Sequence, residues 1–335
     1  MNMKFKMKVL PFFLLFCLLL TGCAENRKHT RQLFAMDTVM HLTAYGAYAE
    51  NALNAVEAEL GRLDAMLSVK QPVSDICRLN TERAEVSEET AALVSEALRL
   101  AAMTGGSFDP TLYPVVDAWG FFSQDYRIPE EAELAALLQA TGWQRVAVSG
   151  TTVSVPEGFA LDLGGIGKGY AGTRVAEVLR ENGVSSALLS LGGNVQAVGA
   201  KPDGKPWVVG IQHPETSSAL LGTVDVENAC VITSGGYQRF FERDGVRYWH
   251  ILDPATGKPA RSGLRSVTIV SENGTAADAL STALFVMGAE RAEAFWRHSP
   301  EPFEAVWMTE DDKIYITEGL RGSFRSSYAY EVVSR

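Results

Sequence analysis

The sequence predicts an α+β fold, one compact unit of mixed helices and sheets. Helical patterns gather in the first half of the chain and β-branched apolar runs in the second half, which argues against a doubly wound parallel sheet. No low-complexity linker interrupts residues 34–332, and no repeat of roughly 20 to 50 residues is present. The chain has 335 residues, 47% of them hydrophobic, and is therefore long enough to bury a substantial core.

The N-terminus has the pattern of a targeting segment. Three lysines among the first eight residues precede an apolar run over 9–20, which is too short to span a bilayer. The run ends in the lipobox Leu-Thr-Gly-Cys at 20–23. We expect a lipoprotein signal peptide at 1–22 and a lipid on the sulfur of Cys23, which would anchor the protein on the extracytoplasmic face of a bacterial cell membrane. The alternative is an ordinary secretory signal with a chance cysteine.

Residues 23–33 are polar and without period, so they are expected to form a flexible tether ahead of a catalytic domain at 34–332. The net charge of −10 makes the chain a poor binder of nucleic acid. Two cysteines remain in the folded part, Cys77 and Cys230. They are either one long-range disulfide or two buried thiols.

The first half predicts one strand followed by helices. Phe34 to Ala44 alternates as a strand does, and Ala49 to Leu67 carries a leucine-rich apolar stripe at helical spacing. Later helices are expected over Ser74 to Asn80, from the cap at Ser87 to Gly105-Gly106, and from Pro129 to near Gly142. After them, strands are expected over 146–148, 152–155, 187–191, 207–211, 224–226, 248–252, 266–270 and 314–317.

The segment 161–171 (LDLGGIGKGYA) places four glycines and Lys168 between an apolar strand and a helix that ends at Asn182-Gly183. Glycines let backbone N–H groups approach a ligand, and the helix start favours an anion, so the segment predicts a phosphate cradle. A tight strand-to-helix turn with Lys168 in solvent is the alternative. Further Gly-Gly pairs at 192–193 and 235–236 would let backbone reach the same extended ligand, although hairpins or bulges explain each singly.

The segment 277–288 predicts a buried helix whose first turn carries Asp278, Ser281 and Thr282. One carboxylate and two hydroxyls without His or Cys suit Mg²⁺, which completes its shell with water and phosphate oxygens. Alternatively, Asp278 caps the helix and the hydroxyls bond back to carbonyls.

A histidine, His250, stands at a predicted strand end before an Asp-Pro-Ala-Thr-Gly turn. With the adjacent Asp253 it is a candidate general base. The loop 108–121 is rich in aromatic residues, which either wall a ring system or pack internally.

Taken together, these motifs resemble the ApbE family of FAD:protein FMN transferases. The matching segments run in the family's order over nearly the whole mature chain: AMDTVM at 35, SDICRLN at 74, FDPTLYPVVDAWGF at 108, LDLGGIGKGYA at 161, SLGGN at 190, DGKPWVVGIQHP at 203, TSGGYQRFF at 233, HILDPATGKPA at 250, SVTIV at 266 and ADALSTALFVMG at 277.

The resemblance implies a two-lobed unit with the flavin site between the lobes, and a Mg²⁺-dependent transfer of FMN from FAD to a threonine hydroxyl of a partner protein, with release of AMP. The partner would be an exported or membrane redox subunit. The resemblance also implies the site residues. The metal ligands would be the backbone oxygen of Gly165 with Asp278, Ser281 and Thr282, and the flavin contacts Met36, Ser107, Phe108, Asp109, Asp162, Lys168 and His250.

In this scheme His250 would activate the acceptor hydroxyl, with Asp253 as second choice. Two other functions remain open: an FAD pyrophosphatase that forms FMN and AMP, and a non-catalytic flavin-binding or solute-binding lipoprotein. The metal helix discriminates against the last, because a pure carrier has no need of Mg²⁺ at a pyrophosphate.

Overall fold

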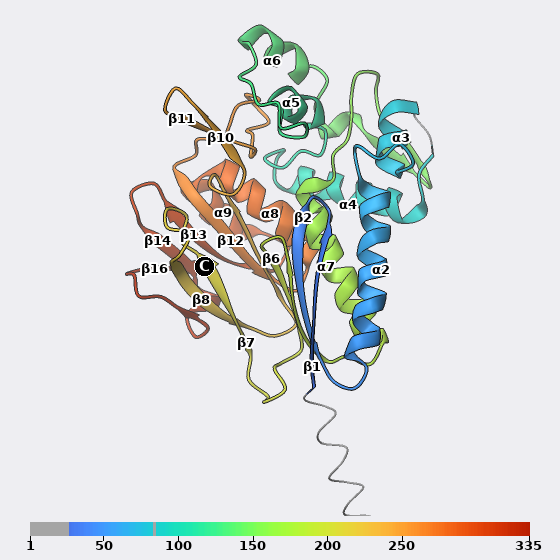
Figure 1. Ribbon diagram of the computed structural model, residues 1–335. Helices are drawn as coiled ribbons and strands as arrows, with labels where there is room; N and C mark the ends of the chain where they lie inside the picture. The colour runs from blue at the N-terminus through green and yellow to red at the C-terminus, as the bar shows by residue number, and fades with distance from the viewer. Residues whose placement is uncertain (1–26, 83–84) are drawn as a thin grey trace, which may run out of the picture.

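The computed structural model describes residues 27–82 and 85–335. Its centre is a nine-stranded sheet in the order β1-β2-β5-β6-β9-β12-β13-β14-β16 (Figure 1). Neighbouring strands are antiparallel except for the last pair, β14 and β16, which is parallel. The strands are β1 (Lys28–Ala35), β2 (Thr38–Tyr45), β5 (Ser186–Leu191), β6 (Asn194–Val198), β9 (Cys230–Gly235), β12 (Leu264–Ser271), β13 (Glu304–Thr309), β14 (Ile314–Thr317) and β16 (Glu331–Val333). This mixture of helices and sheets confirms the α+β class.

Helices cover one face of this sheet and a small sheet covers part of the other. Strand β13 shows both sides, because Ala305 and Trp307 join the helical core while Val306 and Met308 pack against the small sheet. The helices are α2 (Ala49–Leu67), α3 (Asp75–Glu82), α4 (Glu88–Met103), α7 (Gly164–Glu181), α8 (Gly274–Met287) and α9 (Ala289–His298). The small sheet has the order β15 (Phe324–Arg325), β8 (Leu220–Val226), β7 (Trp207–Gln212).

A smaller cap lies at one end of these layers, at the top of Figure 1. It contains α5 (Tyr113–Ala118), α6 (Glu131–Leu138) and the hairpin of β10 (Phe240–Arg243) and β11 (Val246–Trp249). An aromatic core of its own, with Trp119, Phe121 and Phe241, holds it together. The Trp119 indole N–H donates to the Gly257 carbonyl at 2.8 Å, which ties the cap to the turn after His250. The remaining short elements are a 3₁₀ turn at Trp143–Arg145, the β3 (Ala147–Ser149) and β4 (Thr152–Ser154) pair and a 3₁₀ turn at Glu318–Leu320.

The first predicted strand is a hairpin instead. Residues Met36 and Asp37 form its two-residue loop with φ of 51° and 59°. Such loops need two left-handed residues and usually contain Gly or Asn, so the Met-Asp pair gave no turn signal. The predicted helix starts at Ser74 and Ser87 are confirmed, since their hydroxyls accept from Cys77 N–H at 3.0 Å and Thr90 N–H at 3.2 Å.

The tether prediction is wrong for residues 28–33. They belong to β1, which pairs with β2 in unbroken register over eight residues. Their polar pattern arises because only one face of β1 packs on α2, where Arg31 bonds Asn54 and Glu57. The predicted signal peptide, Cys23 and residues 24–26 lie outside the described residues. Across the part that is described, no helix is both long and apolar enough to cross a membrane.

The glycines of the predicted phosphate loop lie inside α7, which begins at Gly164 itself. The loop form of that prediction is therefore wrong. Glycine is needed here for helix packing, because a Cβ on Gly169 would lie 2.0 Å from the carbonyl oxygen of Gly274 in α8. The two cysteines are both free. Burial raises the pKa of the Cys230 thiol to about 12.

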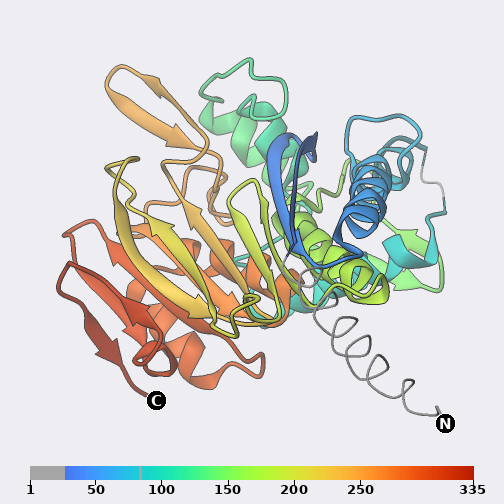
Figure 2. The same cartoon turned by 60° about the horizontal axis from the view of Figure 1, so that its bottom comes forward.

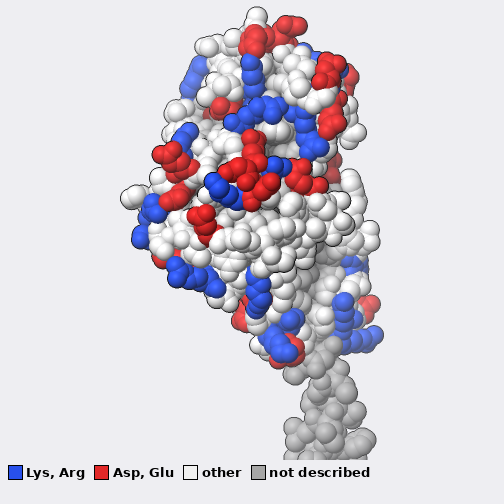
Figure 3. Space-filling model, turned by 90° about the vertical axis from the view of Figure 1, so that its left-hand side faces the viewer, with Lys and Arg blue, Asp and Glu red and all other residues white. Residues whose placement is uncertain are grey.

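Basic and acidic side chains both gather on the upper part of the face shown in Figure 3, above a broad uncharged area. Charges of opposite sign also pair in the described chain; Arg265 of β12, for example, contacts Glu215 at 2.5 Å and Asp312 at 3.3 Å. Such exposed pairs contribute little to stability.

We expect Gly169→Ala to destabilise the fold by at least about 2 kcal/mol, because the methyl group meets backbone that cannot move aside without separating α7 from α8. Gly61→Ala is the matched control, since a Cβ there meets nothing within 4 Å. Alanine in this exposed helical position should stabilise α2 by about 0.5–1 kcal/mol. Urea unfolding of both variants measures the difference; equal midpoints would show that the close approach of the two helices is not required.

Candidate active site

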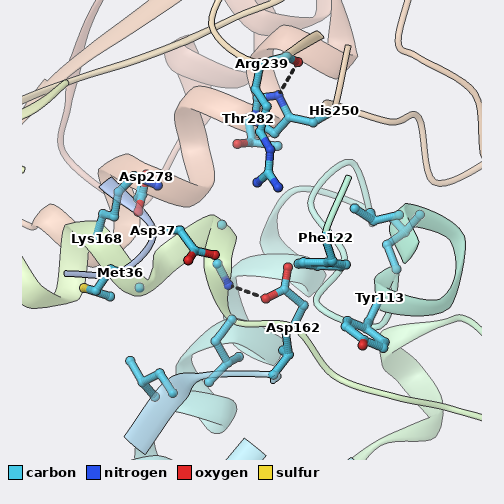
Figure 4. A pocket seen from close by; sticks show the side chains of 18 of the residues that line it. Met36, Asp37, Tyr113, Phe122, Asp162, Lys168, Arg239, His250, Asp278 and Thr282 are labelled. Carbon is cyan, nitrogen blue, oxygen red and sulfur yellow. Dashed lines mark hydrogen bonds between the residues drawn. The ribbon is translucent and has the colours of Figure 1, made fainter. Parts of the chain in front are cut away.

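A cavity of about 510 Å³ lies where the cap meets the N-terminal end of α7, the β1–β2 loop and the strand ends of β9 and β11. Each predicted flavin contact lines it: Met36, Ser107, Phe108, Asp109, Asp162, Lys168 and His250. Figure 4 shows Lys168, Asp278 and Met36 on one side and the rings of Tyr113 and Phe122 on another. The two ring centroids are 4.9 Å apart. The cavity therefore has a charged part and an aromatic part.

Met36 reaches the cavity because it stands in the hairpin loop. Both loop residues hold left-handed backbone, which costs non-glycine residues free energy and is typical of functional sites. The neighbouring Asp37 pairs with Lys70 at 3.4 Å, which connects the loop to the segment after α2. The strained loop is thus fixed from two directions.

The segment that leads into α7 is held by a side chain to which the sequence analysis gave no role. The Asn80 amide accepts from the Leu161 N–H and donates to the Leu161 carbonyl, both at 2.8 Å, as a neighbouring strand would. The next residue, Asp162, accepts from the Gly164 N–H at 2.9 Å. Burial raises the pKa of the Asp162 carboxyl. Only long-range pairing reveals the role of Asn80, since 81 positions separate it from Leu161.

The three predicted flavin contacts at 107–109 differ in the hydrogen bonds and packing contacts that their side chains already make within the protein. The Asp109 carboxylate accepts from Thr111 N–H at 2.9 Å, Thr111 Oγ1 at 2.6 Å and Trp143 N–H at 3.2 Å, so it shapes the loop. Burial raises the pKa of Asp109. Phe108 packs on Gly165, where a Cβ would lie 2.9 Å from the ring. Ser107 accepts weakly from Arg291, at 3.5 Å.

Asp278 stands in the second turn of α8, because the helix begins at Gly274 and is capped by Asn273. The prediction that Asp278 is in the first turn is therefore wrong, and so is the alternative that it caps the helix. The carboxylate is buried, with 6% exposed. Its Oδ2 accepts from the Gly169 N–H at 2.9 Å and its Oδ1 from the Asn194 amide at 3.0 Å. In an ideal α-helix the Gly169 N–H donates to the Gly165 carbonyl. Here this N–H donates to the Asp278 carboxylate.

The predicted metal ligands do not all face the cavity. Gly165, Asp278 and Thr282 line it, but Ser281 is fully buried and donates to the Asp278 carbonyl at 2.8 Å. Ser281 as a ligand is therefore not supported. A hydroxyl that the sequence analysis missed, Ser234, lines the cavity 3.3 Å from Thr282 Oγ1.

The remaining oxygen donors fit a hard cation. Within residues 27–82 and 85–335, no three His, Cys, Asp or Glu side chains cluster as ligands for one ion. One carboxylate, hydroxyls and a carbonyl are too few for a dedicated protein cage. They suit Mg²⁺, which keeps waters and binds substrate phosphates.

His250 lies one residue beyond β11, with Nδ1 3.2 Å from the Arg239 carbonyl oxygen (Figure 4). A carbonyl only accepts, so Nδ1 carries the proton and the lone pair is on Nε2. Burial, aided by the positive charges of Arg239 and Lys168, lowers the pKa of His250 to about 4. The ring is therefore neutral at physiological pH.

Asp253 does not line the cavity. Its Oδ1 accepts from the Ala255 N–H at 2.9 Å within the turn. The prediction of Asp253 as a second base is therefore wrong, because the side chain lies outside the cavity.

Lys168 lines the cavity and forms no salt bridge with any residue that the structure describes. Of the Gly-Gly pairs, 164–165 and Gly192 line the cavity, whereas 235–236 does not.

Comparisons with known proteins agree over most of the chain. The ApbE family model matches residues 36–307. A curated FAD:protein FMN transferase of Treponema pallidum (strain Nichols) is 32% identical over 94% of this chain and 93% of its own. The crystal structure of the ApbE protein from Thermotoga maritima has a TM-score of 0.82 at 32% identity, over 88% of this chain and 98% of that one. The flavin transferase ApbE from Vibrio cholerae gives 0.79 at 29% identity, over 89% and 99%. The architecture, the cavity and these matches together show that the chain belongs to the ApbE family.

Proposed function

We propose that this enzyme is an FAD:protein FMN transferase that moves FMN from FAD to a threonine hydroxyl of a partner protein and releases AMP. The observation that carries the proposal is one cavity in which three groups converge: a buried carboxylate with hydroxyl neighbours, a lysine that forms no salt bridge with the described residues, and a neutral histidine. Curated relatives at about one-third identity over most of the chain carry this transferase name.

The chain's own groups supply the binding and proton transfer that the reaction needs. The hydroxyl oxygen forms a bond to the FMN phosphorus, the phosphorus–oxygen bond to AMP breaks, and the hydroxyl proton passes to Nε2 of His250. Lys168 offsets charge on the departing AMP phosphate. Tyr113 and Phe122 offer ring faces to the isoalloxazine. When bound by Asp278, Thr282 and the Gly165 carbonyl, Mg²⁺ supplies neutralisation of pyrophosphate charge.

The same site would serve a pyrophosphatase if water replaced the threonine. Mass spectrometry of an exported redox subunit after incubation with FAD and Mg²⁺ separates the possibilities. Addition of FMN less one water to one threonine supports the transferase. Free FMN and AMP without a labelled protein would assign a hydrolase, and neither product would assign a flavin-binding protein.

The lipobox supports a location for the reaction. We propose that lipidated Cys23 holds the domain on the extracytoplasmic face of the cell membrane, where exported or membrane-bound redox subunits are within reach.

Asp278→Asn should lower Mg²⁺-dependent FAD turnover at least about 100-fold, because it keeps the shape and removes the charge that attracts the cation. Asp253→Asn is the control, since an asparagine oxygen can still accept from Ala255 and the side chain is outside the cavity. It should remain within about twofold of wild type. Turnover against Mg²⁺ concentration checks both, and equal losses would refute the metal assignment.

His250→Ala should lower kcat by about 10²-fold or more at saturating FAD, as expected for loss of a positioned base. Because the pKa of His250 is lowered to about 4, the base stays unprotonated as the pH falls from 8 to about 5, and kcat should decline only nearer pH 4. Steady-state pH profiles test this. An acid limb near the ordinary histidine pKa of about 6.5, or a raised KM with unchanged kcat, would reassign His250 to flavin binding.

Cys23→Ser should release the protein from membranes and leave its activity in vitro unchanged, because the anchor is a lipid and not the folded domain. Cell fractionation with a processed-length check measures it. Retention of the processed Cys23→Ser protein on membranes would contradict the lipoprotein assignment.

A further inference from the structure

Strand β1 is an end strand of the nine-stranded sheet. Among residues 27–82 and 85–335, β2 is its only pairing partner, and the register is unbroken from Lys28–Tyr45 to Ala35–Thr38. Figures 1 and 2 both show the dark blue β1 beside β2, with α2 alongside. A long edge strand without a bulge or proline offers its outer N–H and C=O groups for pairing with another chain.

Hairpin geometry identifies these outer groups. The two residues that flank a two-residue loop form a hydrogen-bonded pair, here Ala35 and Thr38, and such pairs alternate along the ladder. The backbone groups that point away from β2 are therefore those of Lys28, Thr30, Gln32 and Phe34. The side chains of these same four residues are exposed. At these four positions both the unpaired backbone groups and the side chains are therefore accessible to another chain.

The free edge leads to the cavity. Phe34 is 71% exposed and also lines the cavity, and its cross-strand neighbour Val39 is 44% exposed. The next residues, Met36 and Asp37, form the strained loop at the cavity wall. Natural edges are usually protected by charges or prolines. At its cavity end this edge instead presents the apolar Phe34, with Val39 of β2 beside it.

We propose that the free edge of β1 binds an extended segment of the acceptor protein as an added strand and so delivers its hydroxyl residue to the cavity. This inference rests on the proposed transferase function. Backbone hydrogen bonds supply affinity, and an apolar residue of the segment packs on Phe34 and Val39. A strand advances about 3.4 Å per residue, so a segment paired along Lys28 to Phe34 enters the cavity within a few residues of Phe34.

A second copy of the chain is a poorer occupant of this edge. Symmetric antiparallel pairing of two β1 strands with full overlap over residues 28–34 places the apolar Phe34 of one copy beside the charged Lys28 of the other, and registers that avoid this pair fewer residues. An acceptor segment has no such constraint, because its sequence can place an apolar residue opposite Phe34.

Gln32→Pro tests the proposal. It removes one outward N–H and adds a ring at the free edge, but it breaks no β1–β2 hydrogen bond, and prolines are tolerated on edge strands in this position. Gln32→Ala is the matched control, because it removes the side chain and keeps the N–H. The probe is the acceptor protein labelled in the mass-spectrometric experiment.

We expect Gln32→Pro to raise the KM for the acceptor at least about tenfold, while Gln32→Ala, and FAD binding by either variant, stay within about twofold of wild type. An equal KM for the two variants overturns the proposal. So does a wild-type dimer that Gln32→Pro converts to a monomer, which would assign the edge to a second copy. Absence of labelling by wild type would instead refute the transferase function itself.

A second measurement needs no variant. Hydrogen exchange of the wild-type protein, with and without a peptide of about twelve residues spanning the labelled threonine, should show slower exchange at the amides of Thr30, Gln32 and Phe34. Unchanged exchange at a saturating peptide concentration overturns the proposal.

Discussion

The buried carboxylate of Asp278 is the constraint on which the rest of the site depends. A charged group with 6% exposure must be compensated, and its two oxygens accept from the Gly169 N–H in α7 and the Asn194 amide in β6. The first of these bonds requires α7 and α8 to approach closely, which is possible only because Gly169 and Gly274 lack side chains. The same contacts that satisfy Asp278 therefore bring the start of α7, with Gly165 and Lys168, to the cavity.

Desolvation shifts the pKa values of the ionisable groups in the cavity in different directions. It raises the pKa of the Asp109 and Asp162 carboxyls, and hydrogen bonds from the Thr111 hydroxyl at Asp109 and from backbone N–H groups at both offset only part of that rise. It lowers the pKa of His250, where the two nearby cations act in the same direction. The neutral imidazole is thus the outcome first of burial and second of the positive charges of Arg239 and Lys168. This leaves an available lone pair in a site suited to an anionic substrate.

The β1–β2 hairpin extends from an exposed edge of the sheet to the wall of the cavity. Its loop holds Met36 at the cavity in left-handed backbone, and its outer strand leaves one edge of the sheet unpaired up to the same point. The strain at the loop is tolerated because eight strand pairs and the Asp37–Lys70 contact fix the hairpin. One local element therefore contributes both a wall of the cavity and an approach to it.

The sequence alone determined the α+β class, the capped helices at Ser74 and Ser87, the central strands β5, β12 and β14, and many of the residues that line the cavity, because periodicity, caps and long motifs are local signals. It did not predict the central strands β6, β9, β13 and β16. It did not reveal the hairpin at Met36-Asp37, whose residues are unusual for a tight turn, or the strand over residues 28–33, whose polar pattern resembles a tether. Only the tertiary structure showed that Ser234 lines the cavity while Ser281, bonded behind it, does not, and that Asp253 lies outside the cavity, since the direction of a side chain depends on what packs around it. It also gave Asn80 a role, because that role exists only in contact with a backbone segment 81 positions away.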